Sequence, residues 1–374
     1  MQMQYKNITI IGGGLAGLTA AIHLSKKGFD VVIIEKNKYP KHKVCGEYIS
    51  NEVIPYFENL GIDIEKMLPE NIENLEFSST KGTIIKTKLP LGGFGVSRYD
   101  LDYYLYQKAI SNGCKFIFDT TENISFQKGI FTIKTLNNIQ IVSKIVLGAF
   151  GKRSNIDVNL NRSFISKKSN WLGVKGHYKG FFENGLVGLH NFEGGYCGVS
   201  KVSNDIINIC YLTNYKSFKK FKNPIDFQNQ VLSKNPNLKN IFENATLIFD
   251  KPLTISQISF SKKNPVENNV LMIGDTAGLI HPLCGNGMAM AIHSAKIASE
   301  LVIDFLNGKI ETQTKLEYLY TKQWNANFKK RLQTGRLLGK LLQKPKLANI
   351  IMRIFVKTPF LMPIIIKKTH GKPF

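Results

Sequence analysis

The sequence predicts an α/β protein in which a parallel sheet with a β-meander is interleaved with an antiparallel sheet and followed by a helical C-terminal region. A glycine-rich turn near the N-terminus lies between two apolar strands, and two more glycine-rich segments follow apolar strands later in the chain. The stretches between these segments are rich in β-branched and aromatic residues, as strands are. A chain of 374 residues can bury a large core. These observations favour about two interleaved domains.

The N-terminal segment has the order of elements that a dinucleotide site requires, which is strand, glycine turn, helix, second strand and acid. Ile8 and Ile10 alternate as strand residues, and a G-x-G-x-x-G turn follows them. Glycine lets the backbone approach a pyrophosphate, whose charge then lies at the positive end of the helix dipole. Glu35 is expected to accept the ribose hydroxyls, which favours an unphosphorylated ribose. The cofactor residues expected here are Gly12, Gly14, Leu15, Ala16, Gly17, Glu35 and Lys36.

Two later segments favour FAD over NAD as the dinucleotide. Residues 148–154 read Gly-Ala-Phe-Gly-Lys-Arg-Ser, and residues 274–287 begin with Gly-Asp and end with Gly-Asn-Gly. A simple NAD dehydrogenase has no use for this late turn, which resembles the turn of glutathione reductase type flavoproteins, where the aspartate binds the ribityl chain. A helix expected from about Met288 to Leu306 would point its positive end at the flavin and stabilise the anionic reduced form. The residues expected to bind FAD here are Gly151, Gly274, Asp275, Gly285, Asn286, Gly287 and Met288.

Strand-rich stretches between these segments set the expected domain organisation. Turn signals occur at Lys81-Gly82, Lys128-Gly129 and Gly194-Gly195. Loop lengths suggest that one antiparallel sheet is inserted into a discontinuous Rossmann-like domain. The expected parts are an FAD-binding domain (1–54, 95–159 and 266–306), a substrate domain (55–94 and 160–265) and a basic helical C-terminal region (307–374).

The composition indicates an intracellular protein without a metal site. The five cysteines show neither metal-ligand spacing nor a disulfide framework, so reduced thiols are expected. The first expected strand begins within a few residues of Met1, which leaves no room for a signal peptide, and no apolar run is long enough to span a membrane. We therefore expect a cytoplasmic protein, with peripheral attachment to the inner face of the membrane as an option.

That option rests on the C-terminal charge. The formal net charge is +23, and no acid follows Glu317, whereas thirteen lysines and arginines do. Apolar runs such as residues 360–366 separate these cations, a pattern typical of basic amphipathic helices at an anionic membrane surface. A helix pair docked on the protein is the alternative. Nucleic acid is disfavoured as a partner, because no nucleic-acid motif accompanies the charge and the region is apolar.

Four elements together resemble the geranylgeranyl reductase family, which belongs with aromatic hydroxylases and flavin-dependent halogenases. They are the N-terminal glycine turn, Val44-Cys45-Gly46-Glu47, Ser97-Arg98-Tyr99-Asp100-Leu101-Asp102 and the run from Gly274 to Gly287. The resemblance implies that Arg98 binds the cofactor on the flavin side and that Cys45 lies near the isoalloxazine. The resemblance covers most of the chain. It supports a prediction of the fold more strongly than a prediction of the substrate.

The chain departs from this family at the substrate sheet. The reductases carry Tyr-x-Trp-x-Phe-Pro, whereas residues 196–200 read Tyr-Cys-Gly-Val-Ser, which opens space beside the flavin and argues against a geranylgeranyl-sized lipid. In the second glycine-rich segment, Phe150 occupies a position where an aspartate or cysteine is common in this family. Halogenases require Trp-x-Trp-x-Ile-Pro, and Trp171-Leu172-Gly173-Val174 does not supply it, so halogenation is disfavoured.

The expected function is an FAD-dependent oxidoreductase that saturates C=C bonds of an isoprenoid or lipid-like substrate by hydride transfer from the reduced flavin. Cys45, Glu47 and Tyr196 are the candidates for proton delivery or substrate placement. NAD(P)H or a protein electron donor would reduce the flavin, although no second dinucleotide turn marks a site for it. Two alternatives remain: an FAD-dependent monooxygenase of an aromatic or polyketide-like substrate, and an electron-carrying flavoprotein at a membrane surface.

Overall fold

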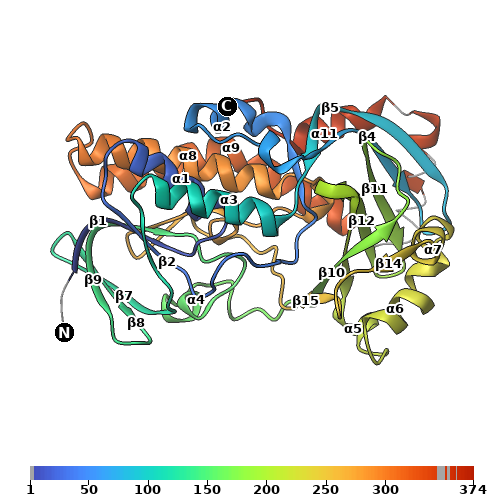
Figure 1. Ribbon diagram of the computed structural model, residues 1–374, viewed down its shortest axis with the longest axis horizontal. Coiled ribbons are helices and arrows are strands. Elements are labelled where there is room, and N and C mark those ends of the chain that lie inside the picture. Colours follow the sequence, from blue (N-terminus) through green and yellow to red (C-terminus); the bar gives the residue numbers. More distant parts are fainter. Residues whose placement is uncertain (1–3, 343–349, 352–353, 359) are drawn as a thin grey trace.

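The computed structural model describes residues 4–342, 350–351, 354–358 and 360–374. These residues form two large sheets at opposite ends of an elongated molecule, with long helices lying along one side (Figure 1). The arrangement confirms the predicted α/β architecture, with its parallel nucleotide-binding sheet, β-meander and helical C-terminal region.

The first sheet is parallel at its centre. Its strands are β1 (Gln4–Ile11), β2 (Val31–Ile34), β6 (Lys115–Ile117), β7 (Thr121–Gln127), β8 (Ile130–Thr135), β9 (Gln140–Gly148), β16 (Val266–Glu267) and β17 (Val270–Met272). β1 pairs in parallel with β2 and β9, and β17 pairs in parallel with β9. β7 and β8 extend β9 as an antiparallel meander. Because β1, β9 and β17 run in one direction, the glycine-rich turns that follow them meet at one edge of the sheet.

The second sheet holds most of the strands expected for the substrate domain. Its strands are β3 (Tyr48–Ser50), β4 (Glu70–Ser78), β5 (Ile84–Gly95), β10 (Trp171–Gly180), β11 (Leu186–Phe192), β12 (Gly195–Val202), β13 (Ile206–Asn214), β14 (Ala245–Leu247) and β15 (Leu253–Ile255). The sheet is antiparallel except between β4 and β11, which pair in parallel. The chain leaves the sheet for the nucleotide-binding half between these two strands, so no hairpin constrains their direction. β3 lies within residues 1–54 and still pairs with β5; the domain boundaries stay a prediction.

The long helices cover one face of the first sheet, and short helices between residues 215 and 243 pack on the second sheet. Their bounds are α1 (Leu15–Lys26), α2 (Ile54–Leu60), α3 (Arg98–Ser111), α4 (Asn155–Asn159), α5 (Tyr215–Phe218), α6 (Pro224–Gln230), α7 (Pro236–Glu243), α8 (Gly287–Leu306), α9 (Gln313–Leu342) and α11 (Leu361–Thr369). α1 packs between α3 and α8, and α9 covers the outer side of α8 (Figure 1). Small buried residues such as Ala20, Ala289 and Ala298 let α1 and α8 approach each other closely. The helix expected at about Met288 to Leu306 is confirmed as α8.

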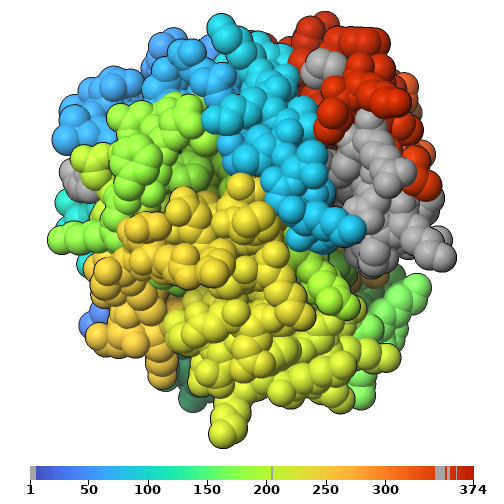
Figure 2. Space-filling view, turned by 90° about the vertical axis from the view of Figure 1, so that its right-hand side faces the viewer, coloured from blue at the N-terminus to red at the C-terminus, as the bar shows by residue number. Residues whose placement is uncertain are grey.

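The C-terminal region packs on the rest of the protein where the structure describes it. α9 buries Leu316, Tyr320 and Phe328 in the hydrophobic core that α8 and the first sheet form. α11 packs on β5 and α9, where Met362 joins a cluster with Phe77. Figure 2 shows the described C-terminal segments beside β4 and β5. Among the described residues, no helix combines the length and the apolar character needed to cross a bilayer.

Candidate active site

Glycines shape the turn between β1 and α1. A side chain at Gly12, whose φ is +103°, would overlap the carbonyl oxygen of Ala149, and one at Gly17 would overlap the carbonyl oxygen of Gly12. Gly14 is different, because an added Cβ would come no closer than 3.8 Å to Lys43 Nζ and 4.0 Å to Arg98 Nη2. Contacts within the protein therefore require glycine at positions 12 and 17. Gly14 instead keeps space open at the N-terminus of α1, where a pyrophosphate would bind.

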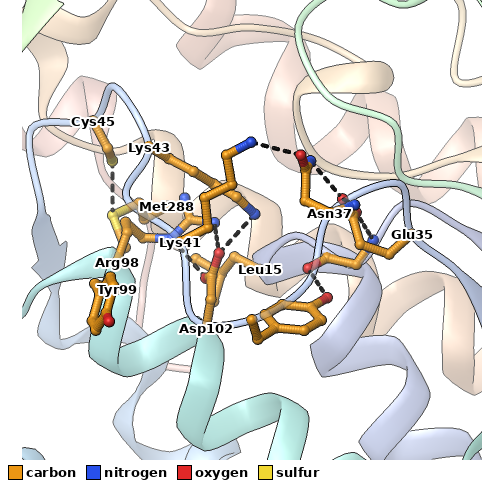
Figure 3. Close-up of polar contacts among 12 residues, drawn as sticks. Leu15, Glu35, Asn37, Lys41, Lys43, Cys45, Arg98, Tyr99, Asp102 and Met288 are labelled. Carbon is orange, nitrogen blue, oxygen red and sulfur yellow. Dashed lines mark hydrogen bonds and ion pairs between the residues drawn. The ribbon is translucent and has the colours of Figure 1, made fainter. Parts of the chain in front are cut away.

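A basic pair faces this space. Arg98 donates two hydrogen bonds of 2.8 Å to Asp102, and Lys43 Nζ lies 2.8 Å from Asp102 Oδ2 (Figure 3). Burial raises the pKa of Asp102, but the charges of Arg98 and Lys43 outweigh it and hold that pKa below its ordinary value. Two cations thus share one buried anion, which leaves a positive charge beside the helix N-terminus. Sequence reasoning missed that Lys43 and Asp102 pair at this site, although Asp102 lies four residues after Arg98, the spacing of a helical ion pair.

Glu35 is fixed at the end of β2. Its Oε2 accepts the backbone N–H of Gly13 at 2.7 Å, and its Oε1 accepts two hydrogen bonds from Asn37, at 3.0 and 2.9 Å (Figure 3). Oε2 keeps a lone pair for a ribose hydroxyl. Lys36, the next residue, is exposed. Glu35 therefore fits the expected contact with the ribose.

The second and third glycine-rich segments are tied together by a lysine that sequence reasoning missed. Lys263 Nζ donates to the carbonyl oxygens of Lys152 and Asp275 at 2.9 and 2.8 Å. Gly151 N–H donates to the hydroxyl of Thr276 at 2.8 Å, which joins the same two segments. Burial lowers the pKa of Lys263 to about 8. No motif surrounds this lysine, so no sequence signal could have found it.

The turn before α8 presents its backbone and its first residues to the site. Gly285 has a φ of +63°, and α8 begins at Gly287. The side chain of Asn286 is buried and donates to Glu52 Oε1, near Arg331 of α9. Any contact of Asn286 with the cofactor would therefore come from its backbone. Met288 Sδ lies 3.4 Å from Cys45 Sγ, which brings the Val44-Glu47 loop to the start of α8 (Figure 3).

Glu47 lies at the centre of a buried ionic cluster. It has a φ of +54°, and its Oε1 accepts the backbone N–H of Arg98 at 2.7 Å and Lys175 Nζ at 2.5 Å. Its Oε2 lies 2.7 Å from His177 Nε2. Burial raises the pKa of Glu47, but the hydrogen bond with His177 and the charge of Lys175 lower it overall. Glu47 is thus a fixed anion that connects the loop to β10. Sequence reasoning missed Lys175 and His177.

An apolar cavity of about 170 Å³ lies between the second sheet and the C-terminal helices. Its end toward the cofactor residues is formed by Gly46, Tyr196, Cys284 and Gly285. Burial raises the pKa of Tyr196 far above its ordinary value, and burial raises the pKa of Cys284 to about 12. Both groups therefore stay protonated at neutral pH. The remaining walls are mostly apolar and include Leu75, Phe77, Leu89, Val187, Leu189, Leu338, Phe355, Met362, Ile365 and Ile366.

The structure therefore gathers the sequence-predicted residues into two adjoining groups. The glycine turns, Glu35, Arg98, Asp275 and Met288 lie at the edge of the first sheet, which is where a dinucleotide binds in such folds. Tyr196 lies in the cavity wall, and Cys45 lies beside the start of α8.

A family model described as "FAD binding domain" matches residues 5–321. The chain belongs to this family. FAD is therefore the cofactor, in agreement with the cradle described above, and the protein is an FAD-dependent oxidoreductase. The resemblance read from the sequence motifs is confirmed, because reductases of the geranylgeranyl type are among its relatives.

Three comparisons show the range of chemistry around this FAD fold. Digeranylgeranylglycerophospholipid reductase of Methanosarcina acetivorans is 24% identical over 336 residues, which cover 85% of this chain and 80% of that protein. The solved structure of the halogenase PltM with phloroglucinol and FAD has a TM-score of 0.77 at 16% identity, covering 97% of this chain and 82% of that one. A probable FAD-dependent monooxygenase of Pseudomonas aeruginosa has a TM-score of 0.74 at 14% identity, covering 94% and 100% of the two chains.

Proposed function

We propose that this FAD-dependent oxidoreductase saturates C=C bonds of an isoprenoid or other lipid-like substrate. The observation that carries the proposal is the apolar cavity, which ends at the cofactor-facing segments around Gly46 and Gly285. Burial of an alkyl chain in such a cavity is worth about 0.8 kcal/mol per CH₂ group. The relative named as a digeranylgeranylglycerophospholipid reductase supports the same substrate class.

The side chains around the cavity have separable roles in this proposal. Reduced FAD, regenerated by NAD(P)H, would supply the hydride. Tyr196 stays a neutral phenol, so it donates a hydrogen bond or a proton and does not act as a base. Glu47 is ionised and fully engaged by its partners, so it is a positioning residue that holds the loop carrying Cys45 and Gly46.

A second candidate function is oxygenation of an aromatic substrate with an alkyl chain. Gly198 lines the cavity wall at the position where the reductases carry tryptophan, and a Cβ there would meet nothing closer than 3.6 Å. That space fits a ring beside the flavin. The likeness in fold to a probable monooxygenase is compatible with this candidate.

Product mass distinguishes these chemistries. The purified holoprotein would be reduced with NADH or NADPH without oxygen and mixed with isoprenoid lipids of graded chain length or long-chain alkylphenols, then sampled before and after oxygen is admitted. We expect lipid products that have gained hydrogen without oxygen. Products that gain an oxygen atom only after oxygen is admitted would support the monooxygenase, and a halogenated product in bromide buffer would contradict both proposals.

Gly198→Trp provides a matched test of the open space. If the protein is a reductase whose lipid chain lies along the cavity walls away from Gly198, installing the family's tryptophan leaves lipid reduction largely intact. If the open space receives an aromatic ring, the same substitution abolishes turnover while FAD stays bound. Reduced protein that reacts with none of these substrates, and only passes electrons to an acceptor, would instead indicate an electron carrier.

A further inference from the structure

We propose that the outer face of the C-terminal region docks on an anionic lipid bilayer. This outer face is defined by six large apolar side chains that are 47–66% exposed. They follow one another along the last part of the chain. The six residues are Leu337, Ile350, Ile354, Val356, Phe360 and Ile364.

In this region, cavity-lining apolar residues lie next to members of the outer face along the chain. Leu338, Phe355 and Ile365 each lie one residue from a member of the outer face, and all three line the apolar cavity. A helix on the surface of a soluble protein needs only one apolar stripe, so apolar side chains exposed beside a buried stripe point to a second apolar contact. The inward side chains of this region already lie against the cavity and β5. The side chains of the outer face are exposed to water, so a second apolar partner would be needed to bury them.

The charges of the region select the partner. Lys340, Lys357, Lys367 and Lys368 are exposed among the apolar residues, and the sequence has no acid after Glu317. An anionic bilayer offers hydrocarbon for the isoleucines and phenylalanine and phosphate for the lysines. A second copy of this chain would bring two faces of like charge together. Nucleic acid would match the charge and leave the apolar side chains exposed to water.

Docking here would also place one wall of the cavity at the bilayer. Phe355 and Ile365 line the cavity and are adjacent in sequence to Val356 and Ile364 of the outer face, so a lipid would have a short path between bilayer and active site. The docking inference itself stands on exposure and charge and does not depend on which reaction the flavin performs.

Vesicle flotation of the full-length holoprotein tests the proposal. The variant Phe360→Glu/Ile364→Glu places two acids in the outer face. The control Ile130→Glu/Leu136→Glu places two acids at exposed apolar positions of the β7–β9 meander, at the opposite end of the molecule (Figure 1). We expect wild type and control to float with phosphatidylcholine/phosphatidylglycerol vesicles, and the outer-face variant to bind at least about tenfold more weakly, a difference of about 1.4 kcal/mol or more.

Several results would overturn the proposal. They are a wild-type protein that fails to float, equal flotation of the two double variants, and a self-association in solution that the outer-face variant abolishes without any binding to vesicles. The flavin spectrum of each variant reports whether it folds. Should Phe360→Glu/Ile364→Glu lose its flavin, Lys367→Gln/Lys368→Gln replaces it, and the expected result is then weaker binding with a shallower salt dependence.

Discussion

At the scale of single residues, Glu47 holds the site together. Its carboxylate receives hydrogen bonds from the start of α3 and from β10, and its backbone lies in the left-handed region that non-glycine residues rarely adopt. Such a conformation persists where the surroundings fix it. The same side chain therefore fixes the loop that brings Cys45 to Met288 and links the two sheets.

Replacing Glu47 with glutamine should destabilise the protein by about 3–5 kcal/mol, because Lys175 would remain charged and buried without an anion. The double variant Glu47→Gln/Lys175→Met should recover part of that loss, since it removes the stranded charge. Urea unfolding of the three proteins, followed by flavin fluorescence, measures both effects. A single variant as stable as wild type would show that the cluster does not support the fold.

The stability that Glu47 contributes should depend on pH. His177 and Lys175 hold the pKa of Glu47 in the folded protein below its ordinary value, so the unfolded chain binds the proton first on acidification. Its contribution is present above the unfolded pKa and is lost as pH falls through the folded pKa. We therefore expect the stability difference between wild type and Glu47→Gln to shrink between neutral pH and about pH 3. A difference that grows with acidity would contradict this assignment.

At the scale of elements, α9 joins the C-terminal region to the flavin side of the site through a face of glycines. A Cβ at Gly339 would come within 2.5 Å of His281 Cδ2, and one at Gly335 within 3.1 Å of Cys284 Sγ. Gly278 makes the same approach from the other side, where Trp324 packs on it. α9 therefore supports the turn that leads into α8 by direct contact.

Gly339→Leu should push α9 away from this turn and cost about 1–3 kcal/mol, as overpacking does. We also expect less bound flavin per chain, because the turn that precedes α8 would shift. Lys340→Leu is the matched control, since it places the same side chain on the neighbouring exposed position. Unfolding midpoints and flavin absorbance compare the variants, and equal values would mean that α9 does not set the position of the turn.

At the scale of the whole molecule, the cofactor site unites distant parts of the chain. The ends of β1, β9 and β17 meet at one edge of the first sheet, and the cavity adds the second sheet and the C-terminal helices. No single segment forms a binding site alone. FAD binding and folding should therefore be coupled.

Removing FAD should lower the thermal midpoint, and restoring it should recover the loss. Free FAD at a hundred times its Kd stabilises the folded state by about 2.7 kcal/mol. FMN is a useful comparison, because it lacks the adenosine part that the Glu35 end of the site would bind. We expect FMN to restore less stability than FAD, and equal midpoints for the apoprotein and the holoprotein would exclude the coupling.

The sequence predicted the fold and the cofactor well because their signals are local. The glycine turn, the helix behind it and Glu35 follow one another along a short stretch, so spacing alone determines their order. The same holds for the turn before α8. The parallel pairing of β4 and β11 was missed, because 107 residues separate the ends of the two strands and no turn residue records their direction.

The sequence by itself thus determined that this protein is an FAD-binding α/β protein with a basic, apolar C-terminal region. Only the tertiary structure decided that Lys175 and His177 meet Glu47, that Lys263 joins two cofactor segments, and that the described C-terminal helices close an apolar cavity. The reason is physical. Backbone turns and helix starts follow from neighbouring residues. A buried charge, in contrast, needs a partner that lies more than a hundred residues away in the sequence, and only folding brings the two together.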